Sequence, residues 1–326
     1  MTNTTILDNQ DSYTQPEIRN LQIPEEAIPV RIFWSYAIAL SAVHLLSLFA
    51  IVPSLFSISG LVVAIISHII LDGLGVSIGY HRLLTHRGFQ CGKWLEYLFA
   101  ILGICTLQDS PARWVAIHRM HHQHTDHRSD PHTPLVTFLW GHVGWLLVVD
   151  RRHDSIYHFE RYVRDLFRDR FYFVIEKYLG WLWIYLAHAV LIGLIGFAYA
   201  NMMLGMTYAD ALWLSASWLV WGVFVRTVFT FHVTMAVNSV CHLWGYRNYE
   251  TADNSHNSWW VALLTFGEGW HNNHHADQRS ARHGHRWCEY DPSWWTICAL
   301  QRLGLVWDVI GPRENLGEEF KTIRPV

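Results

Sequence analysis

The sequence predicts an all-α integral membrane protein, in which four transmembrane helices form two hairpins beneath a cytosolic helical cap. Three observations support this class: long uncharged apolar stretches, a charged fraction of only 16%, and 22 His among 326 residues. Soluble proteins carry roughly 25% charged residues, so the deficit points to a lipid environment. The net charge of −3 and the lack of a basic aromatic motif give no reason to expect nucleic acid as a partner.

Four apolar stretches are each long enough to cross the ~30 Å hydrocarbon core of a bilayer. They span about residues 33–52, 55–80, 179–200 and 211–237, and the last is interrupted only by Arg226. Short connections join the first stretch to the second and the third to the fourth. We therefore expect two transmembrane hairpins.

Lys and Arg are distributed unevenly along the chain. The connections at 53–56 and 201–210 contain none, whereas residues 81–178 contain 13 and residues 238–326 contain eight. Cytosolic loops of membrane proteins carry the excess of positive charge. We therefore expect the N-terminus, the middle segment and the C-terminal segment to face the cytosol, together with any site that they build.

This pattern divides the chain into three parts. Residues 1–32 are polar and contain no secretory signal peptide, so we expect a disordered or loosely packed arm. Residues 33–310 form the membrane domain, in which 81–178 and 238–310 build the cap, and residues 311–326 form a tail.

Three further apolar runs are too short to span a bilayer. The runs at 94–107 and 135–149 predict helices that are buried in the cap or lie at the membrane interface, and 293–309 predicts a helix against the cap or the headgroups. Five Cys without a CxxC pair indicate reduced thiols instead of a disulfide framework.

The His residues are clustered at the cytosolic ends of predicted helices. Positions i, i+3 and i+4 of a helix share one face, so the three rings of an H-x2-H-H box can converge on a metal ion. Eight imidazole nitrogens exceed the four ligands of one tetrahedral ion, and we therefore expect two ions. One H-x4-H pair and two such boxes supply these nitrogens: His81 and His86, then His118, His121 and His122, then His271, His274 and His275.

His242 is a ninth candidate ligand because it follows the fourth span, and Asn238, one helical turn earlier, is placed to hold a metal-bound water. Ligand His residues need oxygen acceptors for their second ring N–H. Acidic residues near the boxes are candidates, although each also fits a solvated or capping charge: Asp72, Asp126, Asp130 and Glu268. We expect core positions for three His within the spans and supporting or surface positions for the other ten; the three are His44, His68 and His188.

The chemistry that best fits this ligand set is redox iron with dioxygen acting on an apolar chain. No paired carboxylates point to hydrolysis, and no Ser or Cys nucleophile motif is present. A hydroxylase, ketolase or alkane oxidase with the same boxes stays open, as does a catalytically inactive paralogue. A metal transporter or a bis-His haem protein is a further alternative, but transporter ligands lie in the middle of spans.

The motifs carry a specific resemblance. They read GYHRLLTH, WVAIHRMHH, DPH, GHVGWLL, NSVCHLWGY and WWVALLTFGEGWHNNHH, the last followed by SARHG. In these motifs the sequence resembles the membrane fatty acid desaturase family over roughly residues 33–310. It is most similar to the Δ9, stearoyl-type branch and to its bacterial and cyanobacterial members.

The resemblance implies a mushroom-shaped fold with a non-haem di-iron centre in the cap, and dioxygen-dependent insertion of a cis double bond at the ninth carbon of a saturated acyl chain. Two Fe would be held by nine His, with Asn238 reaching metal through water; the nine match His81, His86, His118, His121, His122, His242, His271, His274 and His275. The kink of the substrate tunnel would be lined by Gln108, Trp114 and Thr234.

Two departures from the animal members concern the substrate. Animal acyl-CoA desaturases have an Arg-Asp pair where this chain has Ala116-Ile117, and a basic pair where it has Val149-Asp150, with Arg151-Arg152 just after. An acyl chain esterified in a glycerolipid is therefore favoured over acyl-CoA. No cytochrome b5 domain is fused, so we expect a separate electron donor such as ferredoxin or cytochrome b5.

Overall fold

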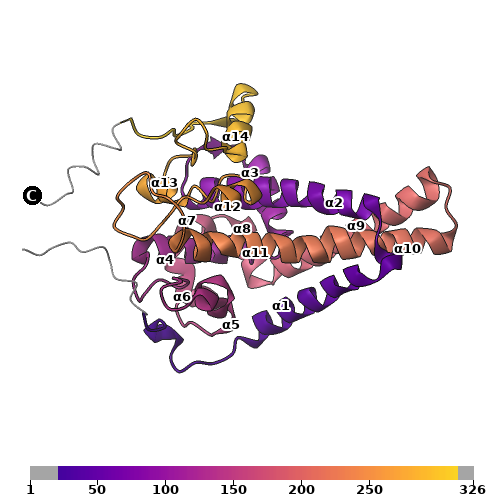
Figure 1. Ribbon diagram of the computed structural model, residues 1–326, viewed down its shortest axis with the longest axis horizontal. Coiled ribbons are helices and arrows are strands. Elements are labelled where there is room, and N and C mark those ends of the chain that lie inside the picture. Colours follow the sequence, from indigo (N-terminus) through magenta and orange to yellow (C-terminus); the bar gives the residue numbers. More distant parts are fainter. Residues whose placement is uncertain (1–20, 315–326) are drawn as a thin grey trace, which may run out of the picture.

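The computed structural model describes residues 21–314, and the predictions for residues 1–20 and 315–326 lie outside this range. The described chain is helical apart from one antiparallel pair of short strands, β1 (Gln90–Cys91) and β2 (Val306–Trp307). Four helices are long and apolar enough to cross a membrane. The all-α membrane fold that the sequence predicts is therefore confirmed (Figure 1).

The first two membrane helices form one hairpin. The first consists of α1 (Trp34–Ser47) and the 3-10 turn η2 (Leu48–Ile51). The second, Ile58–Thr85, runs from α2 (Ile58–His68) into the π-helical η4 (Ile69–Thr85). The helix continues past residue 80, where the predicted span ends, to Thr85, and the polar end of η4 that carries His81 is buried.

The second hairpin pairs Gly180–Met203 with Tyr208–His242. The former is α9 (Gly180–Ala198) with η7 (Tyr199–Met203), and the latter continues through η8 and ends beyond the predicted residue 237. Its segments are α10 (Tyr208–Leu219), η8 (Val220–Val225), α11 (Arg226–Ser239) and η9 (Val240–His242).

The one cation of this helix, Arg226, is 1% exposed. Its Nη1 donates to the carbonyl of Cys105 at 2.9 Å and its Nε donates to the carbonyl of Gly222 at 3.2 Å. A charged side chain at membrane depth raises the free energy of the protein unless it faces the protein interior, as Arg226 does.

The cap consists of short helices at the end of the bundle opposite the two short connections, on the left of Figure 1. Its first part contains α3 (Lys93–Ile104), α4 (Pro111–His124), η5 (Trp140–Gly144), α5 (Trp145–Leu147), α6 (Ile156–Phe159), η6 (Glu160–Tyr162), α7 (Arg164–Phe167) and α8 (Arg170–Lys177). Its second part contains α12 (Trp259–Leu264), α13 (His271–Ala276) and α14 (Pro292–Arg302).

Two of the three short apolar runs differ from their prediction. The run at 94–107 forms α3 as expected, but 135–149 contains only the short helices η5 and α5. The run at 293–309 stops being helical at Arg302, because Val306 and Trp307 pair with β1.

Helix α3 packs against η4 at a very short distance. A Cβ placed on Gly75 would lie 2.2 Å from the backbone nitrogen of Gly103. The two backbones therefore meet where neither position tolerates a side chain, and this contact fixes η4, which carries His81, relative to the cap.

The N-terminal arm is not loosely packed where the structure describes it. The N–H of Leu21 donates to the carbonyl of Leu135 at 2.9 Å, and Ala27 is 1% exposed. An isolated bridge pairs Ile32 with Val148. Residues 21–32 therefore contact the cap through backbone hydrogen bonds and the small buried side chain of Ala27, although Ile28, Val30 and Ile32 are exposed.

Candidate metal centre and cavity

Helix α4 presents one of the two His boxes. Pro111 occupies its first turn, where a proline is favourable. The hydroxyl of Ser110 caps the N-terminus of the helix, because it accepts a hydrogen bond from the N–H of Arg113 at 3.1 Å. The helix continues to His124. Its three box residues are thus held on a rigid, capped segment.

The candidate ligands form two groups, in each of which the ligand atoms lie within 4.8 Å of one another. The five-histidine group contains His81, His86, His118, His122 and His274. The four-histidine group contains His121, His242, His271 and His275. Together these are the nine His residues that the sequence analysis named.

Each box is divided between the groups. Helix α4 contributes His118 and His122 to the five-histidine group and His121 to the other, whereas α13 contributes His271 and His275 to the four-histidine group and His274 to the other. The three rings of a box, which the helical spacing allows to converge, are therefore divided between two points in the structure. At 100° per residue, positions i and i+4 differ by about 40°, but i+3 and i+4 differ by about 100°.

Imidazole nitrogens approach each other closely within both groups. In the five-histidine group, Nε2 of His274 lies 3.1 Å from Nε2 of His81 and 2.9 Å from Nε2 of His122. In the four-histidine group, Nε2 of His271 lies 3.0 Å from that of His242 and 3.1 Å from that of His275. Two nitrogens bound at right angles to one ion lie about 3 Å apart when each metal–nitrogen bond is about 2.1 Å.

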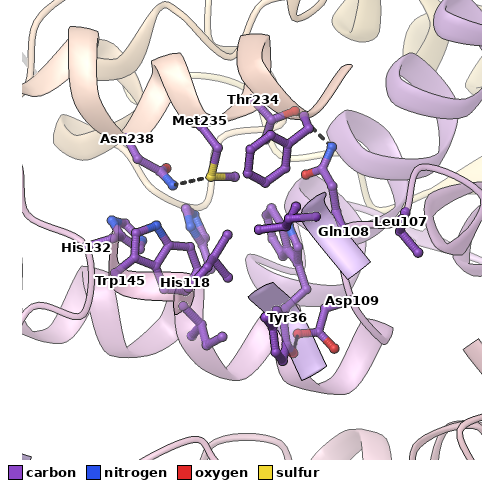
Figure 2. A pocket seen from close by; sticks show the side chains of 15 residues that line it. Tyr36, Leu107, Gln108, Asp109, His118, His132, Trp145, Thr234, Met235 and Asn238 are labelled. Atoms are coloured by element: carbon purple, nitrogen blue, oxygen red, sulfur yellow. Dashed lines mark hydrogen bonds between the residues drawn. The ribbon is translucent and has the colours of Figure 1, made fainter. Parts of the chain in front are cut away.

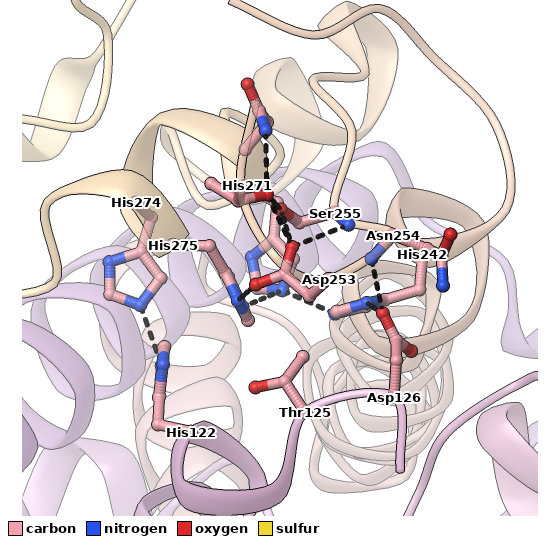
Figure 3. A network of polar contacts seen from close by, with 12 residues as sticks. His122, Thr125, Asp126, His242, Asp253, Asn254, Ser255, His271, His274 and His275 are labelled. Carbon is pink, nitrogen blue, oxygen red and sulfur yellow. Dashed lines mark hydrogen bonds and ion pairs between the residues drawn. The ribbon is translucent and has the colours of Figure 1, made fainter. Parts of the chain in front are cut away.

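Four of the nine rings donate their Nδ1–H to a buried carboxylate. His121 donates to Asp130 at 2.9 Å, and His275 donates to Asp253 at 2.9 Å. The other two pairs are His242 with Asp126, at 3.1 Å, and His81 with Glu268. Figure 3 shows the pairs of His242 with Asp126 and of His275 with Asp253. Such bonds fix the tautomer, so each Nε2 carries a lone pair.

These lone pairs point at one another without enough protons to pair them, an arrangement that suits a bound cation. The Nε2 atoms of His242 and His275 both face His271, which can donate only one proton, and Nε2 of His121 has no hydrogen-bond partner. Burial lowers the pKa of His271 well below its ordinary value, so this ring is neutral as well. Converging neutral nitrogen donors fit a first-row transition-metal ion.

Three of the four predicted carboxylate partners are confirmed as neighbours of the His groups, namely Asp126, Asp130 and Glu268. The fourth, Asp72, contacts no His in residues 21–314 and instead lines the cavity described below. Asp253 was missed, because it lies in the loop between η9 and α12, where no spacing relates it to a box. Hydrogen bonds from Ser255 orient its carboxylate.

The structure also places the other His residues, and most of those described here lie where the sequence analysis expected them. His132 and His283 are buried, with their Nδ1 atoms 3.8 Å from Asp130 and 3.5 Å from Glu268, respectively, so they support the metal groups. His68 is a core residue as predicted, bonded to Thr230 and the carbonyl of Leu264. His44 is not a core residue, since it is only partly buried.

An apolar cavity reaches the metal groups from the membrane side (Figure 2). All three predicted tunnel residues line it: Gln108 Nε2 donates to Thr234 Oγ1 at 2.9 Å, and Trp114 stacks on His118 with ring centroids 5.0 Å apart. A second cavity shares Trp114, His118, Thr234 and Asn238 with the first and also touches His271. The second cavity therefore meets both groups, through His81 and His118 of the five-histidine group and His271 of the four-histidine group.

Comparison with known proteins supplies a family. A family model described as fatty acid desaturase matches residues 55–297. An sn-1 stearoyl-lipid 9-desaturase from Anabaena variabilis is 42% identical over 86% of this chain and 94% of its own length. A protein of the same description from Synechocystis is 41% identical over 86% and 81% of the two chains, and an acyl-CoA C20 Δ5-desaturase from Anemone leveillei is 40% identical over 84% and 81%.

Proposed function

This chain belongs to the fatty acid desaturase family, and we propose that it is a dioxygen-dependent Δ9 desaturase of acyl chains esterified in membrane lipids. The two cyanobacterial relatives described above are named for that activity. We assign the desaturase domain to residues 33–310. The cavity that meets both His groups is the observation that carries the proposal, because it holds one apolar chain beside the candidate metal ligands.

The residues at the two positions where this chain departs from the animal members favour a membrane lipid over acyl-CoA as the substrate. Ala116 and Ile117, at the positions of the animal Arg-Asp pair, are 0% and 6% exposed, so they offer nothing to a phosphate group. Arg152 is bound to Asp150 at 2.5 Å and to the carbonyl of Ser129. Of the displaced basic pair only Arg151 is exposed and available, so the pair of cations that would bind the head of coenzyme A is incomplete.

The family implies a metal cofactor, and we infer two Fe, one in each His group, with Asn238 reaching metal through water. Bound there, iron would supply the oxidation by dioxygen that removes two hydrogens from adjacent carbons. The protein itself positions the chain: Trp114 and the Gln108–Thr234 pair border the cavity beside His118. Holding one conformer against the metal site is an orientation effect.

We place both termini and the metal groups on the cytosolic side of a bilayer. The supporting observation is the distribution of Lys and Arg, of which 13 lie in residues 81–178 and none in the two short connections on the opposite side.

We propose that a separate carrier, ferredoxin or cytochrome b5, delivers electrons at the cap surface. Two hollows there reach ligand residues: one is bordered by His86 and His122, the other by His275. Both hollows include Arg279, an exposed cation. A positive surface above the metal groups suits an acidic electron carrier.

Expression in a desaturase-deficient host tests the function. We expect cis-Δ9 chains in membrane glycerolipids, measured by gas chromatography after separation of lipid classes, and none with His274→Ala. A hydroxylated product, or Δ9 chains that arise first in acyl-CoA, would refute the proposal in favour of a hydroxylase or an acyl-CoA desaturase.

A further inference from the structure

Three imidazoles outside the metal groups join α1, α11 and η5. Nε2 of His44 lies 3.0 Å from Nε2 of His232, and Nδ1 of His232 lies 3.0 Å from Nε2 of His142. We call His44, His232 and His142 the histidine ladder. His44 Nδ1 donates to the carbonyl of Leu40 at 2.6 Å, so its Nε2 accepts the proton of His232. Two of these rings lie within membrane helices, where ionisable side chains are costly and mark functional positions.

Helix α1 alone separates the cavity from the outer surface on this side of the protein. Its inward face bears Tyr36 and Leu40, which line the cavity opposite Thr234 and Met235 of α11 (Figure 2). Its outward face is open to lipid: Trp34, Ile38 and Leu45 are 64–65% exposed. Only one residue of α1, Val43, is buried, and in Figure 1 α1 runs at an angle to the other membrane helices.

We call the interface between α1 and α11 the seam. Between the two ends of the seam, few polar contacts hold the helices together. The cytosolic end of α1 is tied to the cap, where the N–H of Phe33 donates to the carbonyl of Leu147 at 2.8 Å. Within residues 21–314, the His44–His232 contact is the one side-chain hydrogen bond between α1 and α11. Apolar surfaces gain little from association inside lipid, so packing and such hydrogen bonds decide whether the seam stays closed.

We propose that the α1–α11 seam is a lateral portal, through which one acyl chain of a bilayer glycerolipid passes into the cavity, and that the histidine ladder holds the portal closed. The proposal rests on the proposed function. A glycerolipid already has its chain at the depth of the seam, whereas approach through the cytosolic cap would expose both of its tails to water, which the hydrophobic effect opposes.

A cross-link across the seam tests the portal. In a Cys288→Ser background, which removes the exposed native thiol, the pair His44→Cys/His232→Cys is joined with dibromobimane, whose double adduct is fluorescent. The matched control is Ser57→Cys/Ser217→Cys, since these hydroxyl oxygens lie 2.7 Å apart and join α2 to α10 away from the cavity. The probe is a diacyl glycerolipid in vesicles, with a diazirine in its saturated chain.

We expect photolabelling of the peptide that contains Trp114 in both unlinked variants and in the linked control, and its loss in the linked His44/His232 pair. Persistent labelling of the linked pair would overturn the proposal, and so would failure of the two cysteines to form the fluorescent adduct. In addition, His142→Leu should speed labelling because it loosens the ladder, and slower labelling would contradict it.

The labelling readout needs no metal, so it separates the two proposals. A wild-type enzyme that takes up the probe but forms no double bond would refute the proposed function and leave the portal standing. An enzyme that desaturates glycerolipid, and whose linked form is still labelled, would refute the portal alone.

Discussion

Both His groups draw ligands from α4 and α13, but the two groups are supported differently. In the four-histidine group every ring is buried, and three of the four donate to a carboxylate, namely Asp126, Asp130 and Asp253. In the five-histidine group only His81 has such a partner, and His86 and His122 border a hollow in the cap surface.

This difference separates two ways of holding a metal ion. The four-histidine group is preorganised by carboxylates that orient its rings and hold the ring proton on Nδ1, which leaves the lone pair of Nε2 available to a metal ion. The five-histidine group relies on the number of its ligands, and its partial exposure places it nearer to an electron donor. The following predictions test this contrast.

Removal of a ligand should have the largest effect. We expect His118→Ala, His274→Ala and His271→Ala each to abolish double-bond formation while the protein still inserts into membranes. Iron analysis of the purified variants should show loss from one group only, because the groups share no ligand. His127→Ala, at an exposed residue, is the control. An active His118→Ala or His274→Ala enzyme would show that the ligand assignment is incorrect.

Removal of a carboxylate that orients a ligand ring should have the second-largest effect. We expect Asp253→Asn to lower iron affinity by about 10- to 100-fold, because Asn accepts the Nδ1–H of His275 more weakly and does not fix its tautomer. The variant should still fold. Asp210→Asn, at an exposed carboxylate at the start of α10, which Figure 1 places at the opposite end of the bundle from α4 and α13, is the control. Iron titration of detergent-solubilised protein measures both, and equal affinities would contradict the contrast.

The stability of the metal-free protein should depend on pH. Burial lowers the pKa of His118, His122 and His274 well below the ordinary value, so the unfolded chain binds protons below about pH 6.5 that the folded chain does not. Stability should be constant above that pH and fall as the pH decreases.

Thermal melting between pH 8 and pH 5 measures this fall. His122→Leu should flatten the profile, because it removes a ring that resists protonation. His275→Leu should flatten it less, since Asp253 opposes the burial that lowers the pKa of His275. A flatter pH profile for His275→Leu than for His122→Leu would show that the carboxylates do not support the four-histidine group as described.

The smallest effect concerns electron delivery. We expect Arg279→Glu to raise KM for an acidic carrier about three- to tenfold at low ionic strength, with kcat unchanged. Added salt should reduce the difference because it screens exposed charges. Arg302→Glu, at an exposed cation of α14 that borders neither hollow, is the control. An equal effect of both variants would place the carrier elsewhere.

The sequence by itself determined the class of fold and the membership of the site. Apolar length predicted four spans, and the spacing of His81, His118 and His271 with their neighbours predicted ligands on helices. Both depend on local properties, hydropathy and helical period, that a chain carries whatever surrounds it. The helices of two spans continue past the predicted span ends, to Thr85 and His242, because the polar residues there are buried within the protein.

Only the tertiary structure decided how the ligands divide. The helical period sets His121 about 100° from His122, but which rings lie opposite each of them depends on how α4 packs against α13, more than 140 residues later in the chain. The same holds for Asp253, which reaches His275 from a loop, and for α1, whose role as a cavity wall follows from its neighbours. Contacts between distant segments carry no periodic signal, so only the folded chain reveals them.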